Sequence, residues 1–238
     1  MKVALCGYSW AGCRALDILL TEGHDVSVYT HDSPPYDASL LEYATSLNIP
    51  TTTDSINEHV GFGNHDLLCS IYYRNIIKDE VLQRLNYRAM NLHPALLPQY
   101  RGCSSLTWAM INGEKEVGYT YHLVEKTCDT GNILVQKSLP IFSYETQSHL
   151  YKRVMFSALD SFKEAFTLLA QGGLGHEQSG TSSYYKRGAP YDGKINPIWG
   201  EDKIKRFIKA MTYPPLPYAT FKDKEVTSFS DYLKLKRE

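Results

Sequence analysis

Hydrophobic residues near the start of the chain form a short continuous run, followed by a stretch with helical spacing. The run at Lys2–Cys6 is typical of a buried parallel strand, and Gly7 ends it. From Trp10 to Leu20 the apolar positions recur every three or four residues, and Gly23 follows that stretch. The opening of the chain therefore predicts a strand, a turn and a helix.

The same alternation continues to about residue 85. We expect strands at Asp25–Tyr29, Pro50–Thr53 and Asp66–Ile71, and helices at Ala38–Leu47 and Lys78–Leu85. Repeated alternation of strands and helices predicts an α/β fold, with a Rossmann-like, doubly wound and mostly parallel sheet.

The pattern beyond residue 85 adds strands, a short helix and one long helix. We expect a strand from Arg88, a helix at 104–112, and strands at 117–123 and 133–141. Steady three-four spacing at 146–170 predicts one long helix that covers a face of the sheet.

After this helix the composition shifts to Gly, Ser, Tyr and Pro, which indicates a linker. A helix at 201–211 and an alternating stretch at 218–229 follow, and we expect the charged tail at 231–238 to end at the surface. We therefore expect a main domain at residues 1–180, and a linker with a small C-terminal α+β extension at residues 181–238.

Composition narrows the classes of function. The chain has 238 residues, of which 43% are hydrophobic and 21% charged, as is ordinary for a soluble globular enzyme. A formal net charge of −1 gives no indication of a nucleic acid or an anionic membrane as partner. The 5 cysteines include no C-x-x-C pair, so neither a disulfide framework nor a metal site is expected. No leader or long apolar run is recognisable, and we expect a cytoplasmic protein.

Candidate chemistry lies where the strand from Arg88 ends. Successive side chains of a strand alternate between faces, so Asn91 and His93 project together. The polar loop at 125–131 offers Asp129 as a carboxylate partner for the imidazole. These residue types suit attack by an amine on an acyl carbon: Asn91 as oxyanion donor, His93 as proton carrier, Asp129 as its orienting charge. On residue types alone, turn formers and a satisfied polar group are an equally good interpretation.

Residues 91–102 read N-L-H-P-A-L-L-P-Q-Y-R-G, and D-T-G follows at 129–131. Together these segments resemble the signature of the folate-dependent formyltransferases, and the resemblance runs from Met1 to about Pro140. It implies that Asn91, His93 and Asp129 form a catalytic trio, that 10-formyltetrahydrofolate is the co-substrate, and that the main domain is the formyltransferase catalytic domain.

The segment after the strand at Asp66–Ile71 suits a flat heterocycle, because aliphatic side chains and backbone groups lie together there. A strand end with an ordinary amphipathic helix is the alternative. The resemblance implies that this segment holds the pterin, with cofactor-binding roles for Asn75, Ile76, Ile77 and Leu82. Tyr72-Tyr73-Arg74 resembles a run usual in the sugar-modifying branch of the family.

The turn at Gly7–Gly12 is not a G-x-G-x-x-G fingerprint, which leaves a dinucleotide-binding module as a weak alternative. Its backbone N–H groups and helix dipole suit a phosphate. The glycinamide ribonucleotide branch binds its substrate phosphate at the equivalent turn, so the resemblance assigns Tyr8, Ser9 and Trp10 to the phosphates of the acceptor. The alternative for Trp10 is packing at the sheet edge.

Further contacts with the acceptor are expected from the end of the segment at 91–102 and from the linker after the long helix. Ser183–Arg187 resembles a segment that follows the catalytic domain in nucleotide-sugar formyltransferases, and its aromatic and cationic residues suit a base and a diphosphate. A solvated turn is the alternative. We assign the residues Arg101, Tyr185, Lys186 and Arg187 to the acceptor. His122 is expected to pack or bond locally rather than to react, and neither Cys103 nor Cys128 is expected to be a nucleophile.

The resemblance to the sugar branch favours one function. We expect transfer of a formyl group from 10-formyltetrahydrofolate to the amine of a dTDP- or UDP-linked amino-deoxy sugar, for surface glycans such as lipopolysaccharide or O-antigen. A glycinamide ribonucleotide formyltransferase, a 10-formyltetrahydrofolate hydrolase and a non-catalytic nucleotide-binding module stay open. A homodimer formed through the C-terminal segment would resemble some sugar enzymes.

Overall fold

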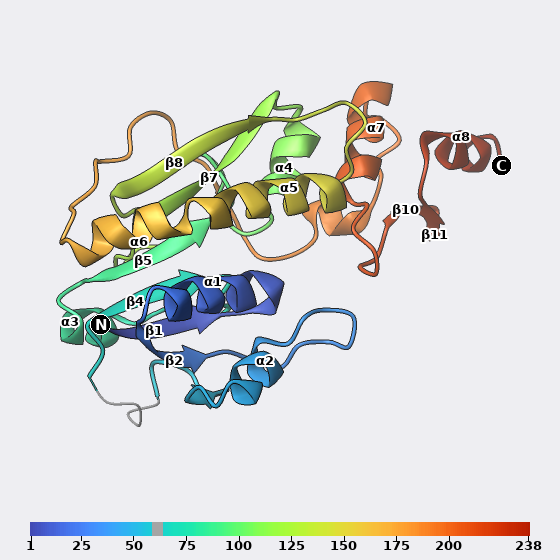
Figure 1. The fold of residues 1–238 in the computed structure, drawn as a ribbon. Coiled ribbons are helices and arrows are strands. Elements are labelled where there is room, and N and C mark those ends of the chain that lie inside the picture. Colours follow the sequence, from blue (N-terminus) through green and yellow to red (C-terminus); the bar gives the residue numbers. More distant parts are fainter. Residues whose placement is uncertain (59–63) are drawn as a thin grey trace. The chain divides into compact units, whose positions relative to one another are not determined.

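A computed structural model describes residues 1–58 and 64–238 (Figure 1). The elements, in chain order, are β1 (Lys2–Gly7), α1 (Ser9–Thr21), β2 (Asp25–Tyr29), α2 (Leu40–Ser46), β3 (Thr51–Thr52), β4 (Leu67–Ile71), α3 (Asp79–Arg84), β5 (Ala89–His93), β6 (Arg101–Gly102), α4 (Ser105–Asn112), β7 (Glu116–Leu123), β8 (Ile133–Pro140), α5 (Gln147–Asp160), α6 (Phe162–Ala170), β9 (Tyr184–Tyr185), η1 (Pro190–Gly193), α7 (Glu201–Ala210), β10 (Ala219–Phe221), β11 (Lys224–Val226) and α8 (Phe229–Arg237).

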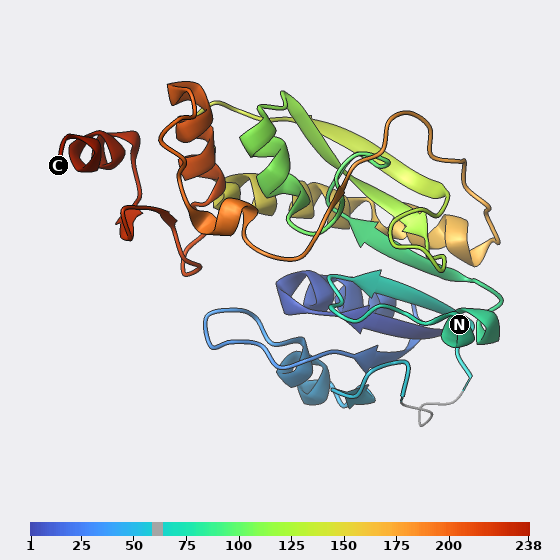
Figure 2. The ribbon, with the colours of Figure 1, turned by 180° about the vertical axis from the view of Figure 1, so that it is seen from behind.

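The central sheet has 7 strands in the order β3-β2-β1-β4-β5-β7-β8. Pairs from β3 to β5 are parallel, and β7 runs antiparallel to β5. Figure 2 shows the arrowheads of β4 and β5 pointing the same way. The expected α/β class with a doubly wound, mostly parallel sheet is confirmed.

Register places the ends of three strands in a row. Gly7 of β1 lies opposite Ile71 of β4, and Ile71 lies opposite Leu92 of β5. Neighbouring strands are about 4.8 Å apart, so the turn after β1 and the end of β5 are separated by about 10 Å along one edge of the sheet. In open α/β sheets, this carboxyl edge is where ligands bind.

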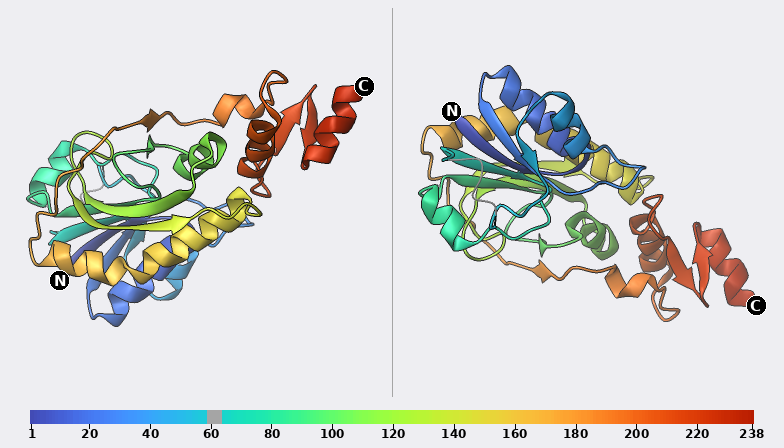
Figure 3. Two further views of the ribbon diagram at one scale, coloured as in Figure 1. Left: turned by 90° about the horizontal axis from the view of Figure 1, so that it is seen from above. Right: turned by 90° about the horizontal axis from the view of Figure 1, so that it is seen from below.

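Helices cover both faces of the parallel strands. Ala4 and Cys6 of β1 pack in one cluster with Leu82 of α3, so the alternate residues of β1 face the opposite side. Figure 3 shows α3 and α1 on opposite faces of the sheet. On the α1 side, the rings of His24 and Phe166 lie 4.7 Å apart, which places α6 beside α1. The central parallel strands β1 and β4 are therefore buried on both faces, as their continuous apolar sequences predict.

Contacts divide the chain into two compact units. The first comprises Met1–His93, Thr120–Gln136 and Ser157–Ser179, and the second comprises Pro94–Tyr119, Lys137–Phe156 and Gly180–Glu238. The division of the chain into residues 1–180 and 181–238 stays a prediction.

The prediction of one long helix at 146–170 is wrong in one respect. Instead of a single helix, α5 ends at Asp160 and α6 begins at Phe162, with Ser161 between them at φ −95 and ψ 0. The Ser161 N–H donates to the Ala158 carbonyl, three residues back, at 2.9 Å. This tighter 3₁₀-type bond interrupts the α-helical ladder although the apolar spacing continues through it.

The charged tail, expected only to end at the surface, forms helix α8. Ser228 caps it, because its hydroxyl accepts a hydrogen bond from the Asp231 N–H at 3.1 Å. Tyr232 is 1% exposed and anchors the helix. Among the helices of the described residues, none is both long enough and apolar enough to cross a lipid bilayer.

Candidate active site

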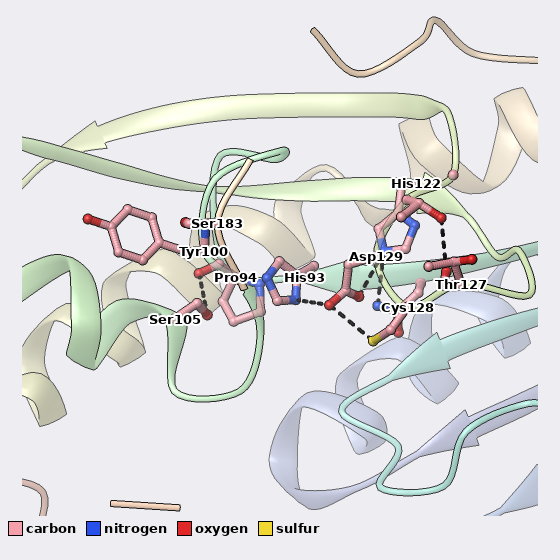
Figure 4. A network of polar contacts seen from close by, with 12 residues as sticks. His93, Pro94, Tyr100, Ser105, His122, Thr127, Cys128, Asp129 and Ser183 are labelled. Carbon is pink, nitrogen blue, oxygen red and sulfur yellow. Dashed lines mark hydrogen bonds and ion pairs between the residues drawn. The ribbon is translucent and has the colours of Figure 1, made fainter. Parts of the chain in front are cut away.

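Asn91, His93 and Asp129 meet in the first unit. β5 carries Asn91 and His93 and pairs with β7, and the loop that follows β7 brings Asp129 to the end of β5. Asp129 Oδ2 lies 3.7 Å from His93 Nδ1, and Oδ1 lies 3.5 Å from His122 Nε2 (Figure 4). His93 and Asp129 are both buried. The carboxylate stabilises positive charge on the buried His93 ring.

The backbone of the D-T-G loop is constrained. Asp129 has φ 57, in the left-handed region, where Asp is one of the better tolerated residues. A Cβ at Gly131 would lie 1.9 Å from the Leu123 carbonyl oxygen, so only glycine fits there. The loop therefore folds back closely against the end of β7, and this directs the carboxylate of Asp129 toward the imidazoles.

His122 connects the trio, which its position in an alternating strand did not reveal. It lies opposite Asn91 in the β5–β7 register. Its Nδ1 is 2.8 Å from the Leu123 carbonyl oxygen, which can only accept, so Nδ1 carries a proton. In the neutral ring Nε2 is then an acceptor, and the Asn91 amide donates to it at 3.2 Å. The expected local bond exists, but His122 also reaches both Asn91 and Asp129.

The side-chain amide of Asn91 has a second N–H that does not point at His122. One amide hydrogen of Asn91 is directed at His122, and the amide carries a second. Asn91 is half-buried, and its strand ends at the carboxyl edge of the sheet. A fixed amide donor beside a charge-stabilised imidazole is suited to an acyl group that gains negative charge on oxygen.

Cys128 lies beside the carboxylate. Its thiol donates to Asp129 Oδ2 at 3.3 Å, on the same oxygen that faces His93. Among residues 1–58 and 64–238 no group of three or more His, Cys, Asp and Glu side chains is arranged to hold a metal ion.

The residues assigned to the pterin differ in exposure. Ile77 is 7% exposed and Leu82 is fully buried, and both belong to the core cluster on the α3 side of the sheet. Ile76 is 75% exposed, and Asn75 donates to the Tyr73 hydroxyl at 3.3 Å. The side chain of Ile76 is thus open to a ligand, whereas Leu82 belongs to the core.

Asn57 fixes this segment from outside the sequence motif. Its amide donates to the Ile76 carbonyl at 2.8 Å and accepts from the Lys78 N–H at 2.8 Å. Both ends of one side-chain amide are used to hold the backbone, so the conformation at 76–78 does not depend on local propensity alone.

A carboxylate from the segment between β2 and α2 lies at the turn after β1. Ser9 is buried with φ 60, and its hydroxyl donates to Asp37 Oδ1 at 2.6 Å. The ring of Tyr8 stacks on the ring of His31, with centroids 4.1 Å apart, and Trp10 is half-buried. The negative charge of Asp37 next to Ser9 disfavours a phosphate at that hydroxyl.

The remaining acceptor residues lie in the second unit. β6 and β9 pair in parallel, with Arg101 opposite Tyr184 and Gly102 opposite Tyr185. The Tyr185 ring stacks on Trp108 at 4.6 Å, and its hydroxyl accepts a hydrogen bond from Asn112 at 3.1 Å. The structure therefore places Arg101 and Tyr185 on two paired strands, although not opposite each other, and leaves the side chains of Lys186 and Arg187 exposed.

A family model described as formyl transferase matches residues 21–165, which is more than half of the chain. The chain belongs to the formyl transferase family. The resemblance noted from the N-L-H and D-T-G segments is confirmed, and the matched range contains Asn91, His93, His122 and Asp129.

Relatives with described activities cover nearly the whole chain. The GDP-perosamine N-formyltransferase of Brucella melitensis is 35% identical over 229 residues, which are 93% of this chain and 88% of that protein. An N-formyltransferase from Helicobacter canadensis, solved with folinic acid and dTDP-3-aminofucose, superposes with a TM-score of 0.82 at 22% identity, covering 95% of this chain and 86% of that one. A sugar 3N-formyl transferase solved with dTDP and 5-N-formyl-THF superposes with a TM-score of 0.80 at 22% identity. The superposition covers 95% of this chain and 85% of that one. The two structures show that the fold is shared.

Proposed function

We propose that this member of the formyl transferase family transfers the formyl group of 10-formyltetrahydrofolate to the amine of a nucleotide-linked amino sugar. The observation that carries the proposal is the convergence of Asn91, His93 and Asp129 at the carboxyl edge of the sheet. The relative at 35% identity is named for GDP-perosamine, so GDP joins dTDP and UDP among the candidate nucleotides.

In the proposed reaction the neutral amine of the sugar attacks the formyl carbon. Asn91 donates to the formyl oxygen as it becomes negative. His93 carries the proton that the amine loses and delivers it to the folate nitrogen, whose bond to the formyl carbon breaks. Asp129 stabilises the imidazolium formed on the way. An imidazolium that stabilises the oxyanion directly is the alternative role of His93.

Two parts of the acceptor have separate proposed contacts. Phosphate oxygens suit the exposed cations Lys186 and Arg187. With Asp37 beside Ser9, the turn after β1 suits hydroxyl or amine groups of a sugar better than phosphate. Tyr8, Ser9 and Trp10 thus remain proposed acceptor residues, with the sugar as their ligand. Arg101 and Tyr185 are retained as acceptor contacts of the second unit.

Loss of the oxyanion donor is the sharpest test of the proposed chemistry. Removing one such donor costs about 2.7–4 kcal/mol of barrier, so Asn91→Ala should lower kcat by roughly a hundredfold or more. Binding of a formyl-folate analogue, followed by calorimetry, should change little. An unchanged kcat would remove Asn91 from the mechanism.

The function itself is tested by incubating the protein with 10-formyltetrahydrofolate and a panel of GDP-, dTDP- and UDP-linked amino sugars. Mass spectrometry should show gain of one formyl group on one panel member, and no gain with His93→Ala. Formylation of glycinamide ribonucleotide instead would indicate the purine branch, and formate release without any acceptor would indicate a hydrolase. Ligand binding without folate turnover would indicate a non-catalytic module.

A further inference from the structure

We propose that Gln178 is a positioning residue that holds the loop carrying Asp129 in its reactive conformation. The proposal rests on the proposed function, because the role of Asp129 belongs to it. Gln178 lies 49 residues beyond Asp129 in the chain, outside every motif that the sequence analysis singled out.

The side-chain amide of Gln178 donates hydrogen bonds to two carbonyl groups of the loop. Its Nε2 donates to the Asp129 carbonyl at 2.9 Å and to the Gly131 carbonyl at 2.8 Å. An amide nitrogen has two hydrogens, so both are used on this loop. The two carbonyls flank Thr130, which means that one side chain fixes the turn on both sides.

The Asp129 loop needs such support. Asp129 has φ 57, a left-handed conformation that a residue other than glycine keeps where surrounding contacts hold it. Its carboxylate lies 3.7 Å from His93 and 3.5 Å from His122, just beyond ordinary hydrogen-bond distance. A displacement of less than 1 Å therefore decides whether these contacts tighten or are lost.

Gln178 is itself attached to the strand that follows the loop. The backbone of His176 exchanges hydrogen bonds with Ile133 at 2.8 and 3.0 Å, and the Asn132 amide donates to the Leu174 carbonyl at 2.9 Å. The segment after α6 thus runs beside the start of β8 within the first unit. Because this anchor is fixed by backbone pairing, the amide of Gln178 is presented to the loop from a rigid base.

The test compares Gln178→Glu with Gln178→Ala. Glutamate has nearly the same shape, but its carboxylate only accepts, so it would face two carbonyl oxygens without a donor. Alanine removes the donors without adding charge, and serves if the glutamate variant does not fold. Gln171→Glu, at an exposed position at the end of α6, is the matched charge control.

We expect kcat to fall roughly 10- to 100-fold in both Gln178 variants, while KM for 10-formyltetrahydrofolate stays within about twofold, since a misplaced catalytic group costs about that much in rate. Hydrogen exchange should rise at residues 126–132 and stay unchanged elsewhere. The control should match the wild type in every measurement. Unchanged kcat, or exchange raised throughout the chain, would overturn the proposal.

One readout is independent of the acceptor. The titration of the His93 ring, followed by NMR, should shift in the Gln178 variants because Asp129 moves, and should not shift in Gln171→Glu. If the wild type formylates no member of the panel, the proposed function fails, yet exchange and titration still decide whether Gln178 positions Asp129. An unshifted titration would count against Gln178 alone.

Discussion

His122 is the side chain through which the amide of Asn91 and the carboxylate of Asp129 are connected. It is 2% exposed, accepts from Asn91 at 3.2 Å and lies 3.5 Å from Asp129. Its Nδ1 is held by the Leu123 carbonyl, which fixes the ring orientation. A buried histidine held in this way orders its neighbours without touching the substrate, so we assign it a positioning role.

Replacing this ring tests that role. His122→Phe keeps a ring but removes the acceptor that orients Asn91, so kcat should fall about 10- to 100-fold, with a smaller change in KM. His122→Gln, which retains a polar group, should recover part of the loss. Steady-state kinetics of both variants, with exposed His149→Phe as control, are the measurement. Equal kcat in His122→Phe and the wild type would contradict the role.

His31 makes stability depend on pH. It is 6% exposed, and burial lowers the pKa of its ring from 6.5 to about 4, with the nearby Arg74 acting in the same direction. Among the described residues its Nδ1 has no hydrogen-bond partner. The unfolded chain therefore takes up the proton first. The stabilisation of the folded state by the neutral His31 ring is complete above pH 6.5 and is lost as pH falls toward about 4.

We predict that the free energy of unfolding falls by up to about 3 kcal/mol more in the wild type than in His31→Phe over that pH range. Phenylalanine keeps the stacking with Tyr8 and does not titrate. Urea unfolding at several pH values measures the difference, and other acidic groups contribute equally to both proteins. Parallel pH profiles would show that His31 does not titrate in this window.

At the scale of elements, the pairing of β6 with β9 depends on one glycine. Gly102 has φ 88, and a Cβ there would lie 2.2 Å from the Tyr185 carbonyl oxygen. That carbonyl accepts from the Cys103 N–H at 2.9 Å. A side chain at position 102 would therefore push the two strands apart and break this bond.

Gly102→Ala should cost about 1.5–3 kcal/mol more than Gly180→Ala, because the control shares only the positive φ penalty. Gly180 has φ 99 with open space around its Cβ direction. Thermal unfolding of the two variants gives the comparison. Similar melting temperatures would mean that the β6–β9 pairing adds little to the stability of the second unit.

At the scale of the whole molecule, the chain ends in a helix that completes the C-terminal extension. The Tyr232 ring lies 5.0 Å from Phe221 of β10, and Lys222 donates to the Leu235 carbonyl at 2.9 Å. The hairpin β10–β11 is thereby covered by α8. An isolated two-stranded hairpin is marginal in water, so the extension needs this helix.

Removal of residues 229–238 should lower the free energy of unfolding by about 3–5 kcal/mol, the burial energy of its two core side chains, Tyr232 and Leu235. Tyr232→Ala should account for much of this loss. Tyr232→Phe should cost almost nothing, since the buried Tyr232 hydroxyl has no hydrogen-bond partner among the described residues. Calorimetry distinguishes these cases. A large loss in Tyr232→Phe would show that the hydroxyl is bonded in solution.

Much of the fold could be predicted because it follows from local pattern. Apolar runs marked β1, β2, β4 and β5, and their alternation with helices indicated a parallel sheet. The pattern was misleading at Ser161, where one backbone bond breaks a helix whose apolar spacing is continuous. It also missed α8, whose apolar positions are few and whose stability comes from contacts with the hairpin.

The sequence by itself determined the order of the elements and the residue types available for chemistry, with Asn91 and His93 on one strand face. These properties depend on neighbours in the chain. Only the tertiary structure decided that His122 lies next to two of the trio, that Gln178 bonds to the Asp129 loop, and that the Asp37 carboxylate accepts from Ser9 at the turn after β1. These contacts join residues 7 to 49 positions apart, and they depend on strand register and loop path, which local periodicity does not specify.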